Sequence, residues 1–353
     1  MSLPNLEQSF VNGTVPTEIG QVPRVLSNLT GADHWGSIKA RLGVGRMHFT
    51  VDPGLYALGA PSPESPVLVT ANYKMSFDRL REALPERDAW ILVLDTKGIN
   101  VWCAAGKGTF DTEELAYRIK SCELEKIVSH RKVILPQLAG PGIAAYKLKD
   151  QCEFKAVYGP IRAEDIPAFL DAGNKATREM RKKTFTTYER AVLIPLELVH
   201  IMKWILILCP LLFIISWLGS GRGFWDDSLT VGLLTVSGIL AAVAAGGVIT
   251  PLLLPWLPGR ALTVKGFIMG LITAVILLFF RIGDLESWSG ILYYFSWFFI
   301  APAIAGYLAM NFTGSTTYTS LSGVKKEMKW AVPAEIGAGC AGLVLWLTSC
   351  VIS

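Results

Sequence analysis

The chain has 353 residues, of which 51% are hydrophobic, and its mean hydropathy is +0.40. This is too apolar for an ordinary soluble protein, yet the charged residues concentrate in the first half, so we expect two regions that face different solvents. The formal net charge of +4 is small, and no basic stripe with interleaved aromatic residues is present, which argues against a nucleic-acid-binding protein. The six cysteines have neither CxxC nor zinc-finger spacing, which argues against a disulfide scaffold.

These patterns predict four segments. Residues 1–20 are polar and are expected to be loose, with no cleavable signal peptide, so export of the next segment is not expected. Residues 21–174 read as one α/β domain, residues 175–198 as a basic juxtamembrane linker, and residues 199–353 as a transmembrane domain.

The α/β domain is expected to alternate strands and helices. Strands are predicted over residues 66–70, 89–95, 132–135 and 154–158. Between and after them we predict a helix over 76–84, a helix capped by Asp111 with Glu114 three residues later, a helix entered through the glycine-rich turn 137–142, and a helix over 163–172. Alternation at this spacing predicts a mostly parallel sheet with helices on both faces.

Five spanning helices are predicted in the second half. They cover roughly 199–218, 229–254, 264–280, 290–310 and 331–352. An odd number of crossings places the two ends of the chain on opposite sides, and Lys and Arg gather before the first helix and in the second and fourth connections. The positive-inside rule then predicts a multi-pass protein of the cytoplasmic (inner) membrane, with a cytoplasmic N-terminal domain and the C-terminus outside.

A permeation pathway is not expected, because Glu197, His200 and Lys203 cluster near the cytoplasmic end of the first spanning helix.

The segment Asn100-Val101-Trp102-Cys103-Ala104-Ala105-Gly106-Lys107 is the strongest candidate for a functional site. It follows the apolar strand over 89–95, and ligands of parallel sheets lie outside the carboxyl ends of the strands. Thr70, Asn72 and the turn with Gly140 and Gly142 also follow strands, so we expect them to share this edge. Helix capping by Thr70 and Asn72, and simple turn formation by the glycines, are open alternatives.

Nucleotide and hydrolase chemistry lack local support. Gly106-Lys107-Gly108-Thr109 superficially resembles a phosphate loop, but Val101 stands where that motif needs glycine, and Gly108 where it needs Ser or Thr. No GxGxxG follows a predicted strand, and no nucleophile elbow or HExxH is present either.

The octapeptide Asn100–Lys107 resembles the signature of the mercury-methylating corrinoid protein family, which is related to the corrinoid iron-sulfur protein large subunit. The resemblance extends through residues 69–74, 94–99 and 157–160, and the family layout of a soluble domain and five helices covers the chain; residues 138–142 are a mild variant of the family's Gly-Ala-Pro-Gly turn. It implies a Rossmann-like corrinoid-binding domain over residues 21–174.

The resemblance also implies roles for the site residues. A corrinoid is expected to bind base-off, with Cys103 as the lower axial ligand of cobalt and the catalytic residue; a soft thiolate is expected to favour release of the methyl group as a carbanion equivalent. Ala104, Ala105 and Gly106 are expected to let the helix approach the corrin, and Lys107 to pair with a corrin amide or phosphate or to keep Cys103 ionised, unless it is simply a solvated helix end. Trp102 stays open between ring contact and core packing. The remaining expected cofactor-binding residues are Thr70, Asn72, Asn100, Val101, Gly140 and Gly142.

The implied reaction is methyl transfer from the methylcobalt(III) corrinoid to Hg(II), which forms methylmercury. Its partners are a ferredoxin-like 4Fe–4S electron donor, because the chain has no four-cysteine cluster motif, a methylated-pterin-dependent methyl donor system, and membrane lipid. Two alternatives remain: a methyl carrier of acetyl-CoA-type one-carbon metabolism, and a membrane sensor or transporter whose soluble domain binds a ligand.

Overall fold

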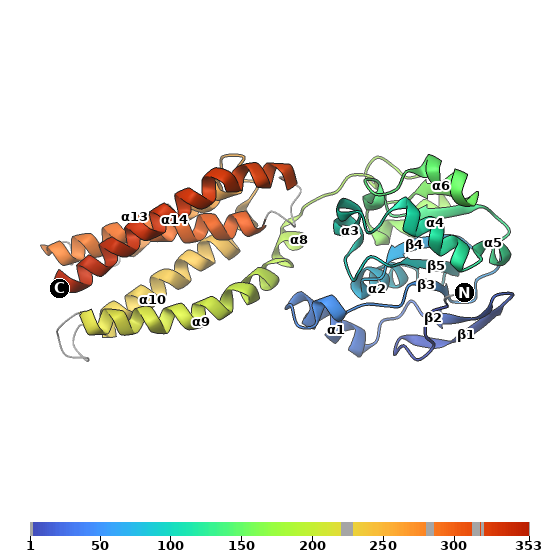
Figure 1. Ribbon diagram of the computed structural model, residues 1–353, viewed down its shortest axis with the longest axis horizontal. Coiled ribbons are helices and arrows are strands. Elements are labelled where there is room, and N and C mark those ends of the chain that lie inside the picture. The colour runs from blue at the N-terminus through green and yellow to red at the C-terminus, as the bar shows by residue number, and fades with distance from the viewer. Residues whose placement is uncertain (1–2, 220–228, 280–285, 313–317, 319–320, 353) are drawn as a thin grey trace. The chain divides into compact units, whose positions relative to one another are not determined.

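The computed structural model describes residues 3–219, 229–279, 286–312, 318 and 321–352 (Figure 1). These residues form two compact units, Met1–Lys183 and Thr184–Ser353. The boundary falls inside the basic segment 175–198 that the sequence predicts as a linker.

A mixed seven-stranded sheet forms the centre of the first unit. Its strand order is β1-β2-β3-β5-β4-β6-β7, and the strands are β1 Val11–Thr17, β2 Gly20–Val25, β3 Gly54–Leu58, β4 Val67–Ala71, β5 Ala89–Leu94, β6 Lys132–Leu135 and β7 Lys155–Tyr158. The strands β5, β4, β6 and β7 are mutually parallel, as predicted, whereas β3 runs antiparallel to β5 and β1 antiparallel to β2. The α/β prediction is therefore confirmed, but the sheet is mixed rather than mostly parallel.

The expectation that residues 1–20 are loose is wrong, because β1 lies within them. This strand is an edge strand whose side chains are mostly exposed, so it carries none of the apolar alternation by which strands are recognised. The strands β2 and β3 were also missed.

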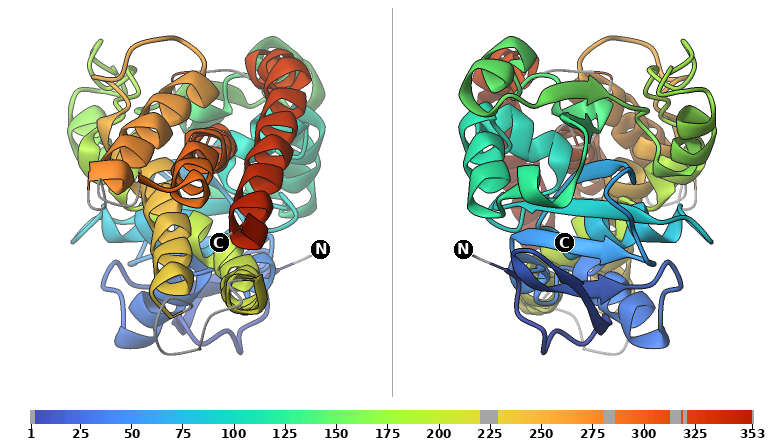
Figure 2. Two further views of the ribbon diagram at one scale, coloured as in Figure 1. Left: turned by 90° about the vertical axis from the view of Figure 1, so that its left-hand side faces the viewer. Right: turned by 90° about the vertical axis from the view of Figure 1, so that its right-hand side faces the viewer.

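Helices cover both faces of the sheet, as predicted (Figure 2). They are α1 Gly31–Arg41, α2 Lys74–Glu82, α3 Val101–Lys107, α4 Thr112–Ser121, α5 Leu124–Ile127, α6 Ala145–Cys152 and α7 Ile166–Asp171, with short 3₁₀ turns η1 Arg46–His48, η2 Gln137–Ala139 and η3 Ala163–Asp165. Strand β5 shows how the two cores are separated: Trp90, Leu92 and Leu94 pack with α3, α4 and α6, whereas the alternate residues pack with α2 and α7.

The predicted cap of α4 is present. Asp111 Oδ1 accepts a hydrogen bond of 2.8 Å from the backbone N–H of Glu114. The Glu114 carboxylate accepts instead from the backbone N–H of Asp95, 2.9 Å away, and so ties α4 to the loop that leaves β5.

The second unit contains the five predicted helices that are long and apolar enough to cross a membrane. Its helices are α8 Thr187–Ala191, α9 Ile194–Gly219, α10 Leu229–Ala244, the π-helical η5 Ala245–Ile249, α11 Thr250–Leu253, α12 Leu262–Phe279, α13 Trp288–Asn311 and α14 Leu321–Ile352. The first span begins at Thr187, inside the predicted linker, and the fifth at Ser322, nine residues before the predicted start at Ala331. Charged residues near these two ends lower the local hydropathy, so a prediction based on hydropathy starts each helix too late in the chain.

Small residues bring the apolar helices of the second unit close together. A Cβ atom added to Gly266 or Gly270 of α12 would overlap the backbone of α13 at Ala305 and Pro302, and one added to Gly246 of η5 would also overlap Ala305. Gly266 and Gly270 are four residues apart on one face of α12, the spacing by which small residues allow close contact of membrane helices.

Candidate functional site around Cys103

The predicted site residues follow the carboxyl ends of the parallel strands. Asn72 comes directly after β4, the segment from Asp95 to Asn100 after β5, and Gly140 and Gly142 come a few residues after β6. Because these strands are parallel neighbours in the sheet, their following segments meet at one edge.

The short helix α3 carries Cys103 at this edge. Asn100 is its N-cap, and its Oδ1 accepts a hydrogen bond of 2.9 Å from the backbone N–H of Cys103. Gly108 ends the helix with a left-handed φ of 73°, which glycine adopts without steric cost. The helix is thus fixed at both ends by residues of suitable local chemistry.

Helix α3 has a buried and an exposed face. Val101, Ala104 and Ala105 pack into the core, whereas Trp102, Gly106 and Lys107 are exposed and Cys103 is half-buried. The thiol therefore lies on the outer face of the helix, in contrast to the buried thiol of Cys122. No atom lies within 4 Å of a Cβ added to Gly106, so the surface beside Cys103 is open.

Asn72 locks the loop that precedes α3. Its Oδ1 accepts from the backbone N–H groups of Thr96 (3.1 Å) and Gly98 (3.0 Å) and from the Thr96 hydroxyl (2.8 Å), and its Nδ2 donates to Asp95 Oδ1. Asn72 is 6% exposed. It does not cap α2, whose N-cap is Tyr73, so its acceptor serves the loop.

The same loop contains backbone strain. Lys97 and Gly98 both have left-handed φ values, 58° and 71°, and only glycine tolerates this conformation freely. The Asp95 carboxylate also stabilises the turn: burial alone raises its pKa, but the hydrogen bonds from the Lys97 side chain and backbone outweigh burial and lower it. Polar contacts thus fix a conformation that the chain would otherwise avoid.

Gly142 brings the glycine-rich turn against α3. A Cβ at this position would overlap the carbonyl oxygen of Phe110 and lie 3.2 Å from Ala105 Cα. At Gly140 the nearest atom to an added Cβ is the Gln137 carbonyl oxygen at 3.3 Å, and the backbone is right-handed. Close approach of two backbones therefore explains Gly142, whereas Gly140 has no such requirement.

Thr70 is not brought to the helix. It alternates along β4 with Val69 and Ala71, which pack in the core beneath α3, so its side chain points to the opposite face of the sheet.

The residues that sequence reasoning missed are Thr96, Gly98 and Phe110. Their roles depend on contacts across the fold, and only the Gly98 turn had a local signal.

The other two cysteines of this unit have packing environments. Burial raises the pKa of the Cys122 thiol, and it also raises the pKa of Cys152, whose Sγ donates to the Leu148 carbonyl. Among the described residues, no group of three or more His, Cys, Asp or Glu side chains is placed to hold a metal ion.

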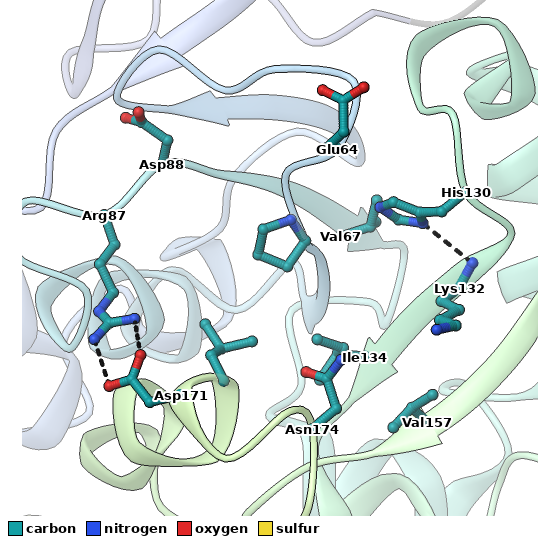
Figure 3. A pocket seen from close by; sticks show the side chains of 12 residues that line it. Glu64, Val67, Arg87, Asp88, His130, Lys132, Ile134, Val157, Asp171 and Asn174 are labelled. Carbon is teal, nitrogen blue, oxygen red and sulfur yellow. Dashed lines mark hydrogen bonds and ion pairs between the residues drawn. The ribbon is translucent and has the colours of Figure 1, made fainter.

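A pocket lies at the opposite, amino-terminal ends of the strands (Figure 3). Arg87 and Asp171 point toward one another there and form a two-bond ion pair of 2.9 and 2.8 Å, and His130 Nδ1 accepts from the Lys132 backbone N–H. None of the predicted site residues lines this pocket. The predicted site is therefore the exposed face of α3 and not this pocket.

Comparison with known proteins relates the first unit to one group of complexes. Residues 45–170 match the family described as CO dehydrogenase/acetyl-CoA synthase delta subunit. The chain is also similar to acetyl-CoA decarbonylase/synthase complex subunits gamma: 29% identical over 123 residues to that of Archaeoglobus fulgidus, 33% over 125 residues to that of Methanopyrus kandleri, and 31% over 140 residues to that of Methanocaldococcus jannaschii.

These matches cover 34%, 34% and 38% of this chain, and 26%, 26% and 28% of the relatives. The chain thus spans about a quarter of the length of the curated relatives it matches. The family match contains β3 to β7 and α3, and it ends before the five apolar helices. Cys103 therefore lies within the residues that match this family.

Proposed function

We propose that this protein is a membrane-anchored corrinoid protein that transfers a methyl group, with Cys103 as the lower ligand of the corrinoid cobalt. The observation that carries the proposal is the half-buried thiol of Cys103 on the open face of α3, a helix positioned by Asn100, Asn72 and Gly142. The similarity to acetyl-CoA decarbonylase/synthase gamma subunits supports a corrinoid at this edge.

The residues on the open face of α3 fit such a cofactor. A soft thiolate is a suitable ligand for a late transition metal, and the open surface beside Gly106 leaves room for a flat ring system above the helix. Trp102, 37% exposed, and Lys107 lie on the exposed side and are proposed to contact the ring edge and a polar substituent. When bound, the corrinoid supplies the metal centre that accepts and gives up a methyl group.

Several residues act by positioning this face. Val101, Ala104 and Ala105 pack into the core and hold α3 on the sheet, so their proposed part in corrinoid binding is indirect, as is that of Asn72. Gly142 permits the close contact with Ala105. Gly140 and Thr70 remain proposed corrinoid-binding residues, but neither supports α3 directly.

The first candidate acceptor is another protein or metal centre of acetyl-CoA-type one-carbon metabolism. The comparisons favour this methyl-carrier function, because the relatives are subunits of acetyl-CoA decarbonylase/synthase complexes. A methylated pterin system is the proposed methyl donor. A ferredoxin-like 4Fe–4S protein is the proposed electron donor, since the chain has no cysteine run for a cluster of its own.

Hg(II) is the second candidate acceptor. The observation that favours it is the octapeptide Asn100–Lys107, which resembles the mercury-methylating family, together with five apolar helices that lie outside the matched residues 45–170.

We also propose that the first unit is cytoplasmic and the C-terminus is outside, because Lys and Arg flank the corresponding helix ends.

The test uses the full chain purified with corrinoid. Cys103→Ala and Cys103→Thr are expected to change the optical spectrum of the bound cobalt and to abolish methyl transfer, whereas the matched control Cys152→Ala should change neither. An unchanged spectrum and undiminished transfer in both Cys103 variants would refute the ligand assignment. Competition between Hg(II) and a purified methyl-accepting subunit for the methyl group then distinguishes the two acceptors.

A further inference from the structure

Glu335 places a carboxyl group inside the second unit. It lies in α14, within the span Ser322–Ile352, and both of its carboxylate oxygens are enclosed with no hydrogen-bond partner among the described residues. An ionised carboxylate that has lost its water and gained no partner is costly, and in practice such a group takes up a proton.

The carboxyl group lies where three helices meet. A Cβ added to Gly306 of α13 would be 3.0 Å from Glu335 Oε1 and 3.4 Å from both the methyl carbon and the carbonyl oxygen of Thr263 on α12. Thr263 is only 5% exposed, and its hydroxyl oxygen also lacks a partner in the described part of the chain. Two unpartnered polar side chains on neighbouring helices therefore flank the same glycine.

A second carboxylate, on the same helix as Glu335, is hydrogen-bonded to Thr263. Glu327, 7% exposed and about two helical turns before Glu335 on α14, accepts a hydrogen bond of 2.7 Å from the Thr263 backbone N–H through its Oε1. This carboxylate has a donor, whereas that of Glu335 has none. The two acids on α14 thus have different environments around one residue of α12.

No described cation neutralises this pair. The one charged residue of α12, Lys265, donates its ammonium N–H groups to the carbonyls of Leu254 (2.7 Å) and Leu257 (2.6 Å). Helix α13 has only tyrosines as titratable residues, and the other charges of α14, Lys325, Lys326 and Lys329, are exposed. No ion pair joins either glutamate to a cation in the described ranges.

We propose that Glu335, Glu327 and Thr263 form a proton-binding site at the junction of α12, α13 and α14, in which the Glu335 carboxyl takes up one proton from water. A hard cation such as Ca²⁺ requires about six to eight oxygen ligands, whereas a proton needs no cavity and a single oxygen. This inference concerns the membrane-spanning unit and does not depend on the function proposed for Cys103.

The experiment is infrared spectroscopy of the full chain in lipid nanodiscs across a pH series. The parent protein is expected to show a carboxylic acid C=O band at neutral pH that shifts in heavy water. The band should be absent in Glu335→Gln and unchanged in the control Glu82→Gln, which alters a surface glutamate of α2. In Glu327→Gln the band should disappear at a lower pH than in the parent protein, because the substitution removes a neighbouring negative charge that favours the protonated form of Glu335. Loss of the band at an unchanged or higher pH would contradict coupling between the two carboxyl groups.

Two results would overturn the proposal. The first is the absence of a neutral-pH band, or a band that persists in Glu335→Gln. The second is loss of the band on addition of Na⁺ or Ca²⁺ at constant pH, which would identify a cation site. If Glu335→Gln does not accumulate, Gly306→Ala places a methyl group 3.0 Å from Oε1 and should shift the pH at which the band is lost; an unshifted band would likewise contradict the proposal.

Discussion

Asn100 and Cys103 are joined by a hydrogen bond of 2.9 Å, from the cysteine backbone N–H to the asparagine Oδ1, that begins the helix on which the thiol is presented. The helix has only seven residues, so one cap satisfies a large share of its free N–H groups. The position of the Cys103 thiol therefore depends on a neighbour three residues earlier that faces the helix start.

Asn100→Ala is expected to loosen α3. Loss of an N-cap side chain costs about 1 kcal/mol, which corresponds to roughly fivefold more frequent opening of the helix. Amide hydrogen exchange of the full chain should become faster in residues 101–107 and stay unchanged in α4. Asn100→Asp retains the acceptor and is the control; equal exchange in the alanine and parent proteins would show that the cap does not stabilise the helix.

Gly142 and Gly140 form a matched pair for testing the contact between the glycine-rich turn and α3. Gly142→Ala is expected to destabilise this contact by about 1–3 kcal/mol, because the added methyl overlaps the Phe110 carbonyl oxygen. Gly140→Ala meets only one atom at 3.3 Å, in a right-handed backbone, and should cost about 0.5 kcal/mol or less.

The measurement for this pair is urea unfolding of the full chain, followed by circular dichroism, together with the amount of corrinoid retained. Gly142→Ala should lower both and Gly140→Ala neither. Equal effects of the two substitutions would mean that turn formation, and not the approach to Ala105, is what requires glycine here.

The position of the candidate site after a strand end could be predicted from the sequence, but the contacts that support it could not. The buried apolar run at Ala89–Leu94 reveals a strand end before Asn100 and Cys103 from local sequence alone, whereas the short helix that carries Cys103 was expected only from the family resemblance. The hydrogen bond between Asn72 and Gly98 joins two residues that are 26 positions apart in the sequence. Its donor is a backbone N–H, which nearly every residue has, so no sequence pattern predicts it. The direction of Thr70 follows only once the register of β4 against β5 is known.

In the second unit, by contrast, the residue was visible in the sequence and its environment was not. Glu335 lies inside an apolar run and is visible in the sequence. The charged residues considered in the sequence were those of the first predicted helix, so Glu335 in the fifth was missed. The enclosed environment of the Glu335 carboxyl group depends on how Gly306 and Thr263 pack near it, and a hydropathy profile contains no information on such packing. Strand β1 was missed for a different reason, because its exposed polar residues lack any periodic signal.

Asp33 is the centre of a buried ionic cluster that joins α1 to α2. Its carboxylate contacts Lys74 Nζ (2.6 Å) and Arg81 Nη2 (2.9 Å), and both cations also contact Asp78. Burial alone raises the pKa of Asp33, but the hydrogen bonds from Lys74 and from the Thr30 backbone outweigh it and hold the pKa well below the ordinary value of 3.8. The charge is therefore strongly favoured in the folded state.

Asp33→Ala is expected to cost about 3–5 kcal/mol at neutral pH, because it leaves two buried cations with one carboxylate. Since the folded-state pKa is lowered, the contribution of Asp33 is complete above the ordinary pKa of 3.8 and is lost as the pH falls toward the folded-state value. The difference in unfolding free energy between parent and variant should therefore shrink below about pH 4. Glu82→Ala, which breaks an exposed pair with Arg79 on α2, is the control and should have little effect at any pH.

Gly266 tests the close packing of α12 on α13. Gly266→Ala places a methyl group against the Ala305 carbonyl oxygen and the Ala309 side chain, so the two helices must separate. We expect a loss of about 1–3 kcal/mol in the stability of the second unit, measured as a lower thermal midpoint of its helical signal in detergent micelles. Gly337→Ala is the matched control, because no atom lies within 4 Å of its added Cβ on α14. It removes a flexible residue from a helix and should leave the midpoint unchanged or slightly raised; a fall in midpoint equal to that of Gly266→Ala would show that the loss does not come from contact with α13.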